Sequence, residues 1–146
     1  MIDELSLRPA TMADAAMLLA WRNDPATRDA SHSTDEVMAH EHRAWLRRCL
    51  DDDCRRLWIG EHDGVGVGTV RADQSAGGWE LSWTVAPAAR GRGIARAMVA
   101  AAVVQLCGPI SAQVKTGNQA SIRVAEHLGM VLTGQAHGVM HFRRDR

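Results

Sequence analysis

The sequence is poor in the residues that build disulfide frameworks, metal sites and P-loops. Only three of its 146 residues are cysteines, and Cys49, Cys54 and Cys107 show no Cys-x-x-Cys spacing. We therefore expect neither a disulfide framework nor a bound metal. A P-loop places lysine between glycine and serine or threonine, but the single lysine, Lys115, lies far from the glycine-rich turn described below. A P-loop is therefore excluded.

Long apolar runs and an excess of charge of one sign are also missing. The 17 basic and 17 acidic residues cancel, and the pI is about 7.1, so no broad basic field attracts nucleic acid or an anionic membrane. No segment approaches about 18 uninterrupted apolar residues. Residues 1–4 lack the basic and apolar regions of a signal peptide. The chain is predicted to be one cytoplasmic domain over residues 1–146, without nucleic-acid or membrane partners.

The chain does contain a turn rich in glycine and arginine, between a strand pattern and a helix pattern. Apolar residues recur at every second position from Trp79 to Val85, which predicts a half-buried strand. They recur at three and four residues from Ile94 to Val104, which predicts a helix. Glycines let a ligand approach the main chain, and the first amides of a helix favour a phosphate, so the turn predicts a diphosphate site. Nearby charged donors are Arg90, Arg92 and Arg96.

Two kinds of diphosphate site compete for this turn. Gly91-Arg92-Gly93 begins a dinucleotide fingerprint, but Arg96 stands where the third small residue belongs. No acidic residue lies near Ala112–Lys115, where one is needed about 20 residues on to hold a ribose. An NAD-dependent oxidoreductase is therefore the weaker interpretation.

The turn also resembles the acetyl-CoA loop of the GNAT acetyltransferases, whose signature is Gln/Arg-x-x-Gly-x-Gly/Ala. Arg90, Gly93 and Ala95 match it in register. The stretch Asn118 to Met130 resembles a second block of that superfamily, Asn-x-x-Ser-Ile-Arg-Val-x-Glu-x-Leu-Gly-Phe, with methionine in place of the aromatic residue. The stretch Leu18 to Pro25 is similar to members that acetylate amino sugars on nucleotide carriers. It is also similar to the branch that acetylates the amino termini of ribosomal proteins.

Further strand and helix signals agree with the fold that this resemblance implies. Strands are predicted at six more places: Leu5–Arg8, Leu57–Glu61, Val65–Arg71, Ile110–Thr116, Met130–Gln135 and Val139–Arg143. Other helices are predicted at Ala15–Trp21, ended by Pro25, and at Asp35–Leu50 and Gln119–Leu128. Asp63-Gly64 marks a hairpin, and a helix between Trp79–Val85 and Ile110–Thr116 implies that these two strands run parallel.

The resemblance implies an α/β (α+β) architecture with a mixed, mostly antiparallel sheet of six to seven strands. About four helices flank this sheet, and one parallel strand pair splays apart to admit the pantetheine arm of acetyl-CoA, the expected co-substrate. Residues expected to bind it are Trp83, Thr84, Val85, Arg90, Gly91, Arg92, Gly93, Ile94, Ala95, Arg96, Asn118 and Ser121. The main-chain amide of Val85 is expected to stabilise the oxyanion of the thioester. Ordinary sheet pairing by Val85 and helix capping by Asn118 are the alternatives.

An attacking amine must lose a proton, so a general base is expected. Glu80 is the first candidate, because strand alternation places it on the face opposite Trp79 and Leu81, which are expected in the core. A solvated carboxylate is the alternative role for Glu80. Later candidates come from the helix at Asp35–Leu50 and the loop before it: His32, Glu36, His40 and Glu41.

The chain contains no tyrosine. Many relatives place one directly before the glutamate matched by Glu126, where it protonates the leaving thiolate, but Ala125 stands there in this chain. Either Ser121, water or another group serves, or the thiolate leaves unassisted. A CoA-binding module without catalytic activity is therefore an alternative from a different class.

Four residues are candidates for the acceptor site: Trp21, Arg22, Asn23 and Trp45. Arginine and asparagine can bind phosphate or sugar hydroxyls, and Trp45 can stack on an acceptor ring. As alternatives, Trp21 belongs to the core and Arg22 pairs with Asp24. We predict acetyl transfer to a primary amine by direct attack in a ternary complex, with a nucleotide-linked amino sugar as the favoured acceptor. A protein or peptide amino terminus is the alternative acceptor, and a homodimer is expected.

Overall fold

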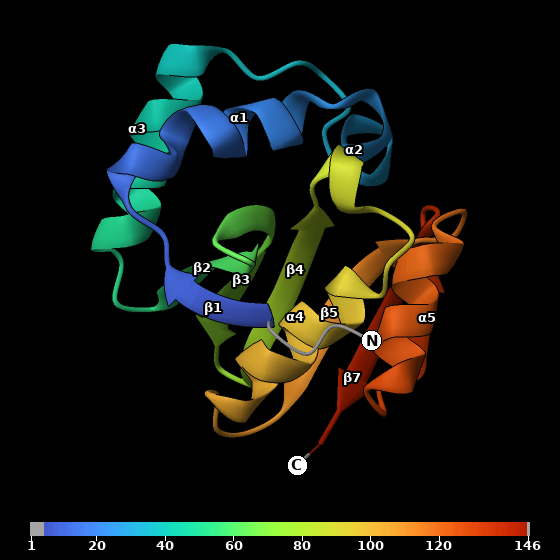
Figure 1. The fold of residues 1–146 in the computed structure, drawn as a ribbon. Helices are drawn as coiled ribbons and strands as arrows, with labels where there is room; N and C mark the ends of the chain where they lie inside the picture. Colours follow the sequence, from blue (N-terminus) through green and yellow to red (C-terminus); the bar gives the residue numbers. More distant parts are fainter. Residues whose placement is uncertain (1–4, 146) are drawn as a thin grey trace.

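The computed structural model describes residues 5–145, which form a seven-stranded sheet with helices on both faces (Figure 1). The strands follow the order β1-β2-β3-β4-β5-β7-β6. Their bounds are β1 Leu5–Pro9, β2 Arg55–His62, β3 Val65–Ser75, β4 Gly78–Val85, β5 Ile110–Lys115, β6 Val131–Ala136 and β7 Val139–Arg144. The α-helices are α1 Ala15–Asn23, α2 Pro25–Ala30, α3 Ala39–Asp51, α4 Ile94–Val104 and α5 Gln119–His127. The expected mixed α/β architecture is confirmed.

Neighbouring strands are antiparallel except for β4 and β5, which are parallel as predicted. The predicted hairpin joins β2 to β3 through Asp63 and Gly64, whose φ angles are 53° and 75°. Both angles lie in the left-handed region that a two-residue hairpin turn of this type requires.

The parallel pair opens toward the carboxyl ends of its strands. Main-chain pairing covers only Trp79 to Leu81 of β4 and Ile110 to Ala112 of β5. Within the described chain the pairing stops there, although β4 continues to Val85 and β5 to Lys115. At the closed end, the Trp79 amide donates to the carbonyl of Pro109 at 3.0 Å. The predicted splay is therefore present between β4 and β5.

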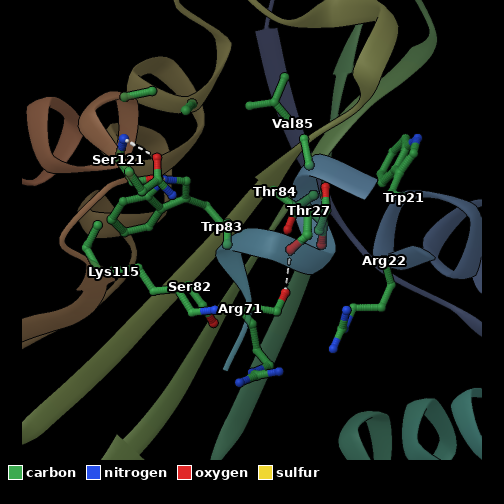
Figure 2. Close-up of a pocket in the computed structure, with 18 of the residues that line it drawn as sticks. Trp21, Arg22, Thr27, Arg71, Ser82, Trp83, Thr84, Val85, Lys115 and Ser121 are labelled. Atoms are coloured by element: carbon green, nitrogen blue, oxygen red, sulfur yellow. Dashed lines mark hydrogen bonds between the residues drawn. The ribbon is translucent and has the colours of Figure 1, made fainter. Parts of the chain in front are cut away.

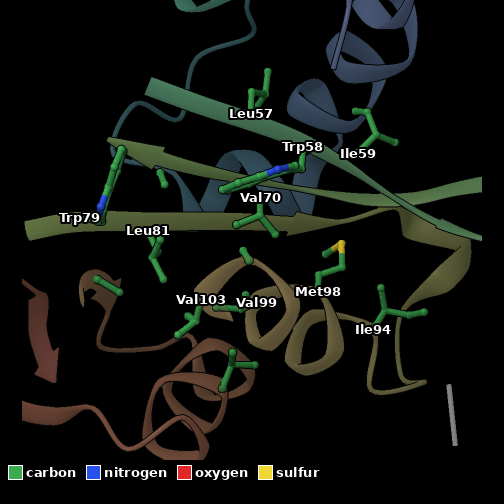
Figure 3. Packing of buried hydrophobic residues seen from close by; sticks show 14 of the residues in the cluster. Leu57, Trp58, Ile59, Val70, Trp79, Leu81, Ile94, Met98, Val99 and Val103 are labelled. Carbon is green, nitrogen blue, oxygen red and sulfur yellow. The ribbon is translucent and has the colours of Figure 1, made fainter. Parts of the chain in front are cut away.

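Helix α4 fixes one face of the sheet, and α1 and α3 pack on the other. Met98, Val99 and Ala102 of α4 are fully buried, and Figure 3 shows Met98 and Val99 directed toward Val70 and Leu81 of the strands. Burial of a side chain as large as that of Met98 or Val99 stabilises the fold by about 1.5–3 kcal/mol. This packing places the amino terminus of α4 beside the open ends of β4 and β5.

Two helix boundaries differ from the sequence-based expectation. Pro25 does not only end α1; it occupies the first turn of α2, whose amino terminus is capped by Asp24 accepting from the Thr27 amide at 3.3 Å. Helix α3 begins at Ala39 rather than at Asp35, because the Asn23 side chain hydrogen-bonds both main-chain groups of Val37, which are then not available for a helix. Asn23 donates to the Val37 carbonyl at 2.9 Å and accepts from its amide at 2.8 Å.

No helix among residues 5–145 has both the length and the apolar character needed to span a bilayer.

Candidate active site

A cavity of about 1550 Å³ extends from the three amino-terminal helices to the splayed strand ends. One wall comes from α1, α2 and α3, and the floor comes from β3 and β4. The opposite wall comes from the turn before α4, the end of β5 and the start of α5. The cavity therefore joins segments from nearly the whole chain at the opening between β4 and β5.

The main chain of β4 offers free polar groups to this opening. The Ala86 amide donates to Val67 of the β3 side at 2.8 Å, whereas the Trp79 amide donates toward β5. Because main-chain groups alternate in direction along a strand, those of Trp83 and Val85 point toward β5. In the described chain, β5 supplies no partner beyond Ala112. An extended ligand in the opening could bond Trp83 and Val85 as an added strand would.

The turn before α4 presents the start of a helix to the cavity. Gly91 and Gly93 have φ angles of 78° and 74°, which residues with a Cβ adopt only with strain. The amides of Ile94 to Arg96 are the first of α4 and therefore have no intrahelical acceptors. The N-cap, Gly93, has no side chain that could accept from them. Those amides lie where a diphosphate is favoured. Arg92, in contrast, is exposed and does not line the cavity.

Arg90 lines the cavity but is held by helix α2. Its guanidinium donates to the Asp24 carboxylate at 2.6 Å and to the Thr27 hydroxyl at 3.2 Å. The Arg90 bond is the main cause of a lowered pKa of Asp24. The alternative pairing of Arg22 with Asp24 is therefore wrong in this structure. Lys115 of β5 donates to the Asp29 carbonyl at 2.8 Å, so α2 is tied to both sides of the opening.

Asn118 and Ser121 sit at the start of α5, opposite Trp83. The Asn118 carbonyl oxygen accepts from the Ser121 amide at 3.2 Å and so caps α5. The Trp83 indole donates to the Ser121 hydroxyl oxygen at 3.2 Å across the opening (Figure 2), which leaves the Ser121 hydroxyl proton available for another acceptor. Ala125, at the position where relatives carry tyrosine, is fully buried.

Glu80 lies at the paired end of β4, beside Ser111 of β5. Its carboxylate accepts from the Gln113 side chain at 2.8 Å, and Glu80 does not line the cavity. Of the later candidate bases, His32 and Glu41 line the cavity, whereas Glu36 and His40 do not.

The sequence interpretation missed a buried histidine in the cavity wall. His42 is 6% exposed, and its ring lies 5.4 Å from that of Trp45. Burial lowers the pKa of His42, and the charge of Arg22 lowers it further. His42 shares the buried face of α3 with Leu46 and Cys49. This i, i+4, i+7 spacing is the signal in the sequence for the buried position of His42.

The predicted acceptor residues lie close together but take different roles. Arg22 lines the cavity and donates to the Ser33 carbonyl at 2.9 Å, while its Nη1 is buried without a hydrogen-bond partner among the described residues. Trp45 lines the cavity with the Arg71 guanidinium 5.6 Å from its ring centre. Trp21 is a buried core residue that reaches the cavity. Asn23 does not line it, because both its polar atoms hold Val37.

Basic residues dominate the cavity although the chain is neutral. The basic residues that line it are Arg22, Arg48, Arg71, Arg90, Arg96, Lys115 and Arg123. Among the described residues that line it, only Asp29 and Glu41 are acidic. The cavity therefore favours ligands that carry negative charge.

A sheet opened between two parallel strands, with a helix amino terminus at one end of the opening, defines a site for acyl transfer from a CoA thioester. In agreement, the family model described as acetyltransferase (GNAT) domain matches residues 4–131. The chain belongs to this family and is an acetyl-CoA-dependent N-acetyltransferase. This assignment overturns the NAD-dependent oxidoreductase alternative.

Solved structures of low sequence identity share the fold. A domain from Methanocaldococcus jannaschii DSM 2661 has 21% identity and a TM-score of 0.87, with 98% of this chain and 99% of that chain covered. Spermidine N-acetyltransferase from Vibrio cholerae, in complex with CoA and spermine, has 18% identity, coverages of 97% and 95%, and a TM-score of 0.84. Ribosomal-protein-alanine N-acetyltransferase from Brucella melitensis has 25% identity, coverages of 97% and 99%, and a TM-score of 0.79. No curated protein matches the chain in sequence.

Proposed function

We propose that the enzyme acetylates a primary amine on a small molecule that also carries negative charge, and that a nucleotide-linked amino sugar is this acceptor. The proposal depends on the basic wall, the part of the cavity lined by arginines of α1, α3 and β3. Arg22, Arg48 and Arg71 line this part of the cavity, and Trp45 offers an aromatic ring beside them. A nucleotide-linked amino sugar combines phosphates for the arginines with rings for stacking.

The same wall argues against a polyamine as the acceptor. The fold neighbour from Vibrio cholerae is named for spermidine, which carries several positive charges. Two like charges about 5 Å apart repel by about 3 kcal/mol at an effective dielectric constant of about 20. Arg22 and Arg71 would therefore disfavour a polycation in this cavity.

A protein amino terminus is the second candidate acceptor, because the Brucella melitensis neighbour is named for ribosomal-protein alanine. An acidic or open groove would favour such an acceptor, because an amino terminus is positively charged until it loses its proton. Asp29 and Glu41 supply the only acidic side chains among the described lining residues, so this acceptor ranks behind the nucleotide-linked amino sugar.

In the proposed reaction, the neutral amine attacks the thioester carbonyl carbon, a C–N bond forms and the C–S bond breaks. The Val85 amide would donate to the carbonyl oxygen as negative charge develops there, an effect worth several kcal/mol in other enzymes. One proton leaves the amine for a base, and the departing thiolate accepts one. We propose that Ser121 relays this proton from water to the thiolate, because Trp83 bonds only the Ser121 oxygen and leaves its hydroxyl proton available.

The test is a thiol-release assay with acetyl-CoA and three acceptors: UDP-glucosamine, spermidine and an alanyl peptide. We expect the highest kcat/KM with UDP-glucosamine. A preference for the alanyl peptide or spermidine would overturn the proposed acceptor. Acetyl-CoA binding without amine-dependent thiol release from any acceptor would instead favour the non-catalytic CoA-binding module.

A further inference from the structure

Arg22 lines the cavity, and one nitrogen of its guanidinium is buried without a partner among the described residues. Its Nη2 donates to the Ser33 carbonyl at 2.9 Å, which fixes the guanidinium at the end of α1. Its Nη1 is buried and has no partner among residues 5–145. Arginine stays charged in proteins, and a buried charged donor without an acceptor is costly. Arg22 as a residue lines the cavity, so a ligand with a strong acceptor that rotated its guanidinium outward would remove this cost.

Arg71 of β3 carries a second guanidinium, which packs against Trp45 of α3. Its Nε donates to the Asp73 carboxylate at 3.2 Å, and its Cζ lies 5.6 Å from the centre of the Trp45 ring. Figure 2 shows the Arg22 and Arg71 side chains extending from α1 and β3. The Asp73 bond uses only Nε, so the two terminal nitrogens of Arg71 keep donors for a ligand.

Among residues 5–145, no carboxylate pairs with Arg22. The acidic residues that line the cavity, Asp29 and Glu41, are exposed, and neither forms an ion pair with Arg22 or Arg71 in the described chain. His42, the buried neighbour of Trp45, is neutral or positively charged in every protonation state, so it offers Arg22 no negative charge. An anionic group of a bound molecule would supply an acceptor that these side chains do not.

This region is distinct from the turn proposed to hold the diphosphate of acetyl-CoA. Arg71 stacks on Trp45 of α3, whereas its neighbour Val70 faces Met98 of α4 (Figure 3). Since adjacent strand residues point to opposite faces, Arg71 and the α4 side lie on different faces of the sheet.

We propose that Arg22 and Arg71 form a phosphate-binding subsite for the acceptor, with Trp45 beside it. The inference rests on the proposed function, in which the acceptor amine belongs to a molecule with negative charge. It narrows the basic wall to two guanidiniums that act together on one phosphoryl group of the acceptor.

The experiment is a calorimetric titration of CoA-saturated protein with UDP, which has phosphates but no amine. Bound CoA occupies the turn before α4, so UDP reports on the second subsite. Arg22→Gln and Arg71→Gln are each expected to weaken UDP binding about tenfold or more. Arg47→Gln is the matched control, because Arg47 is exposed and does not line the cavity; it should bind UDP as the wild type does.

CoA affinity is measured for every variant as the check of folding, and Arg22→Lys serves where Arg22→Gln fails that check. Absence of UDP binding to the CoA-saturated wild type would overturn the subsite, and so would equal UDP affinity in correctly folded Arg22 and Arg71 variants. Arginine-dependent UDP binding without acetylation of UDP-glucosamine would support the subsite and overturn the nucleotide-sugar acceptor. Acetylation of UDP-glucosamine with an unchanged KM in both variants would retain the acceptor and overturn the subsite.

Discussion

At the residue scale, burial of His42 links the stability of the enzyme to pH. Burial, and then the charge of Arg22, lower the pKa of His42 in the folded state. The unfolded chain therefore takes up this proton at a higher pH than the folded chain does. The stabilisation from neutral His42 is complete above about pH 6.5 and is lost as the pH falls from there through the lowered folded pKa.

The expected result is a free energy of unfolding that decreases between about pH 7 and about pH 5.5, by up to about 1.4 kcal/mol for each unit of pKa difference. Urea unfolding at several pH values measures it. The variant His42→Gln, which cannot titrate, should lose part of this decrease. The same pH dependence in both proteins would show that His42 is not responsible.

His42 and Glu80 can also be compared as the general base. Glu80 stays the candidate that strand alternation favours, but it is bonded to Gln113 outside the cavity, whereas His42 lines the cavity wall. We expect His42→Gln to lower kcat about a hundredfold, within the range for a general base, and Glu80→Gln to lower it less. Thiol release from acetyl-CoA with the best acceptor, followed from about pH 6 to about pH 9, measures both. The opposite order would assign the base to Glu80.

At the scale of elements, the turn before α4 can be tested with a matched pair of glycines. Gly93 and Gly64 have φ angles of 74° and 75°, and a Cβ at either position meets open space. Aspartate should therefore cost similar backbone strain at both, about 1–2 kcal/mol of stability. Only Gly93→Asp adds negative charge where the diphosphate is expected, so it should weaken acetyl-CoA binding at least about tenfold.

Calorimetric titration with acetyl-CoA measures this difference. Gly64→Asp, in the hairpin between β2 and β3, is the control and should keep wild-type affinity. If Gly93→Asp keeps it as well, the turn does not bind the diphosphate.

Elements whose signals are local could be predicted from the sequence. The hairpin at Asp63-Gly64 and the alternating strand β4 depend on neighbouring residues alone, and both are confirmed. The start of α3 could not be predicted, because it depends on bonds between Asn23 and Val37, which are 14 residues apart.

In the candidate site, too, local signals could be predicted and contacts between distant residues could not. The motifs located the turn before α4 and the start of α5, both of which line the cavity. They did not indicate that Arg90 bonds Asp24, because 66 residues separate the two in the chain. They also missed the cavity position of His42, which follows from how α3 packs on the sheet. Contacts between distant segments, rather than local propensity, decide these details.

At the scale of the whole molecule, the cavity couples ligand binding to folding. Its walls come from α1 through α5 and from β3 to β5, so the site exists only when these elements are assembled. The homodimer expected from the sequence stays a prediction, and the argument for ligand stabilisation does not depend on it.

Acetyl-CoA should therefore raise the thermal stability of the enzyme. A ligand that binds only the folded state, at about 100 times its Kd, stabilises that state by about 2.7 kcal/mol. For a chain of this length, such a gain raises the Tm by about 10 °C. A thermal melt followed by tryptophan fluorescence measures the shift, with NAD at the same concentration as the control ligand. Because NAD lacks the pantetheine arm expected to pair with β4, it should raise the Tm much less than acetyl-CoA does. Gly93→Asp should remove most of the shift with acetyl-CoA. An equal shift with NAD would mean that the protein responds to nucleotides in general, and the argument from the splayed strands would fail.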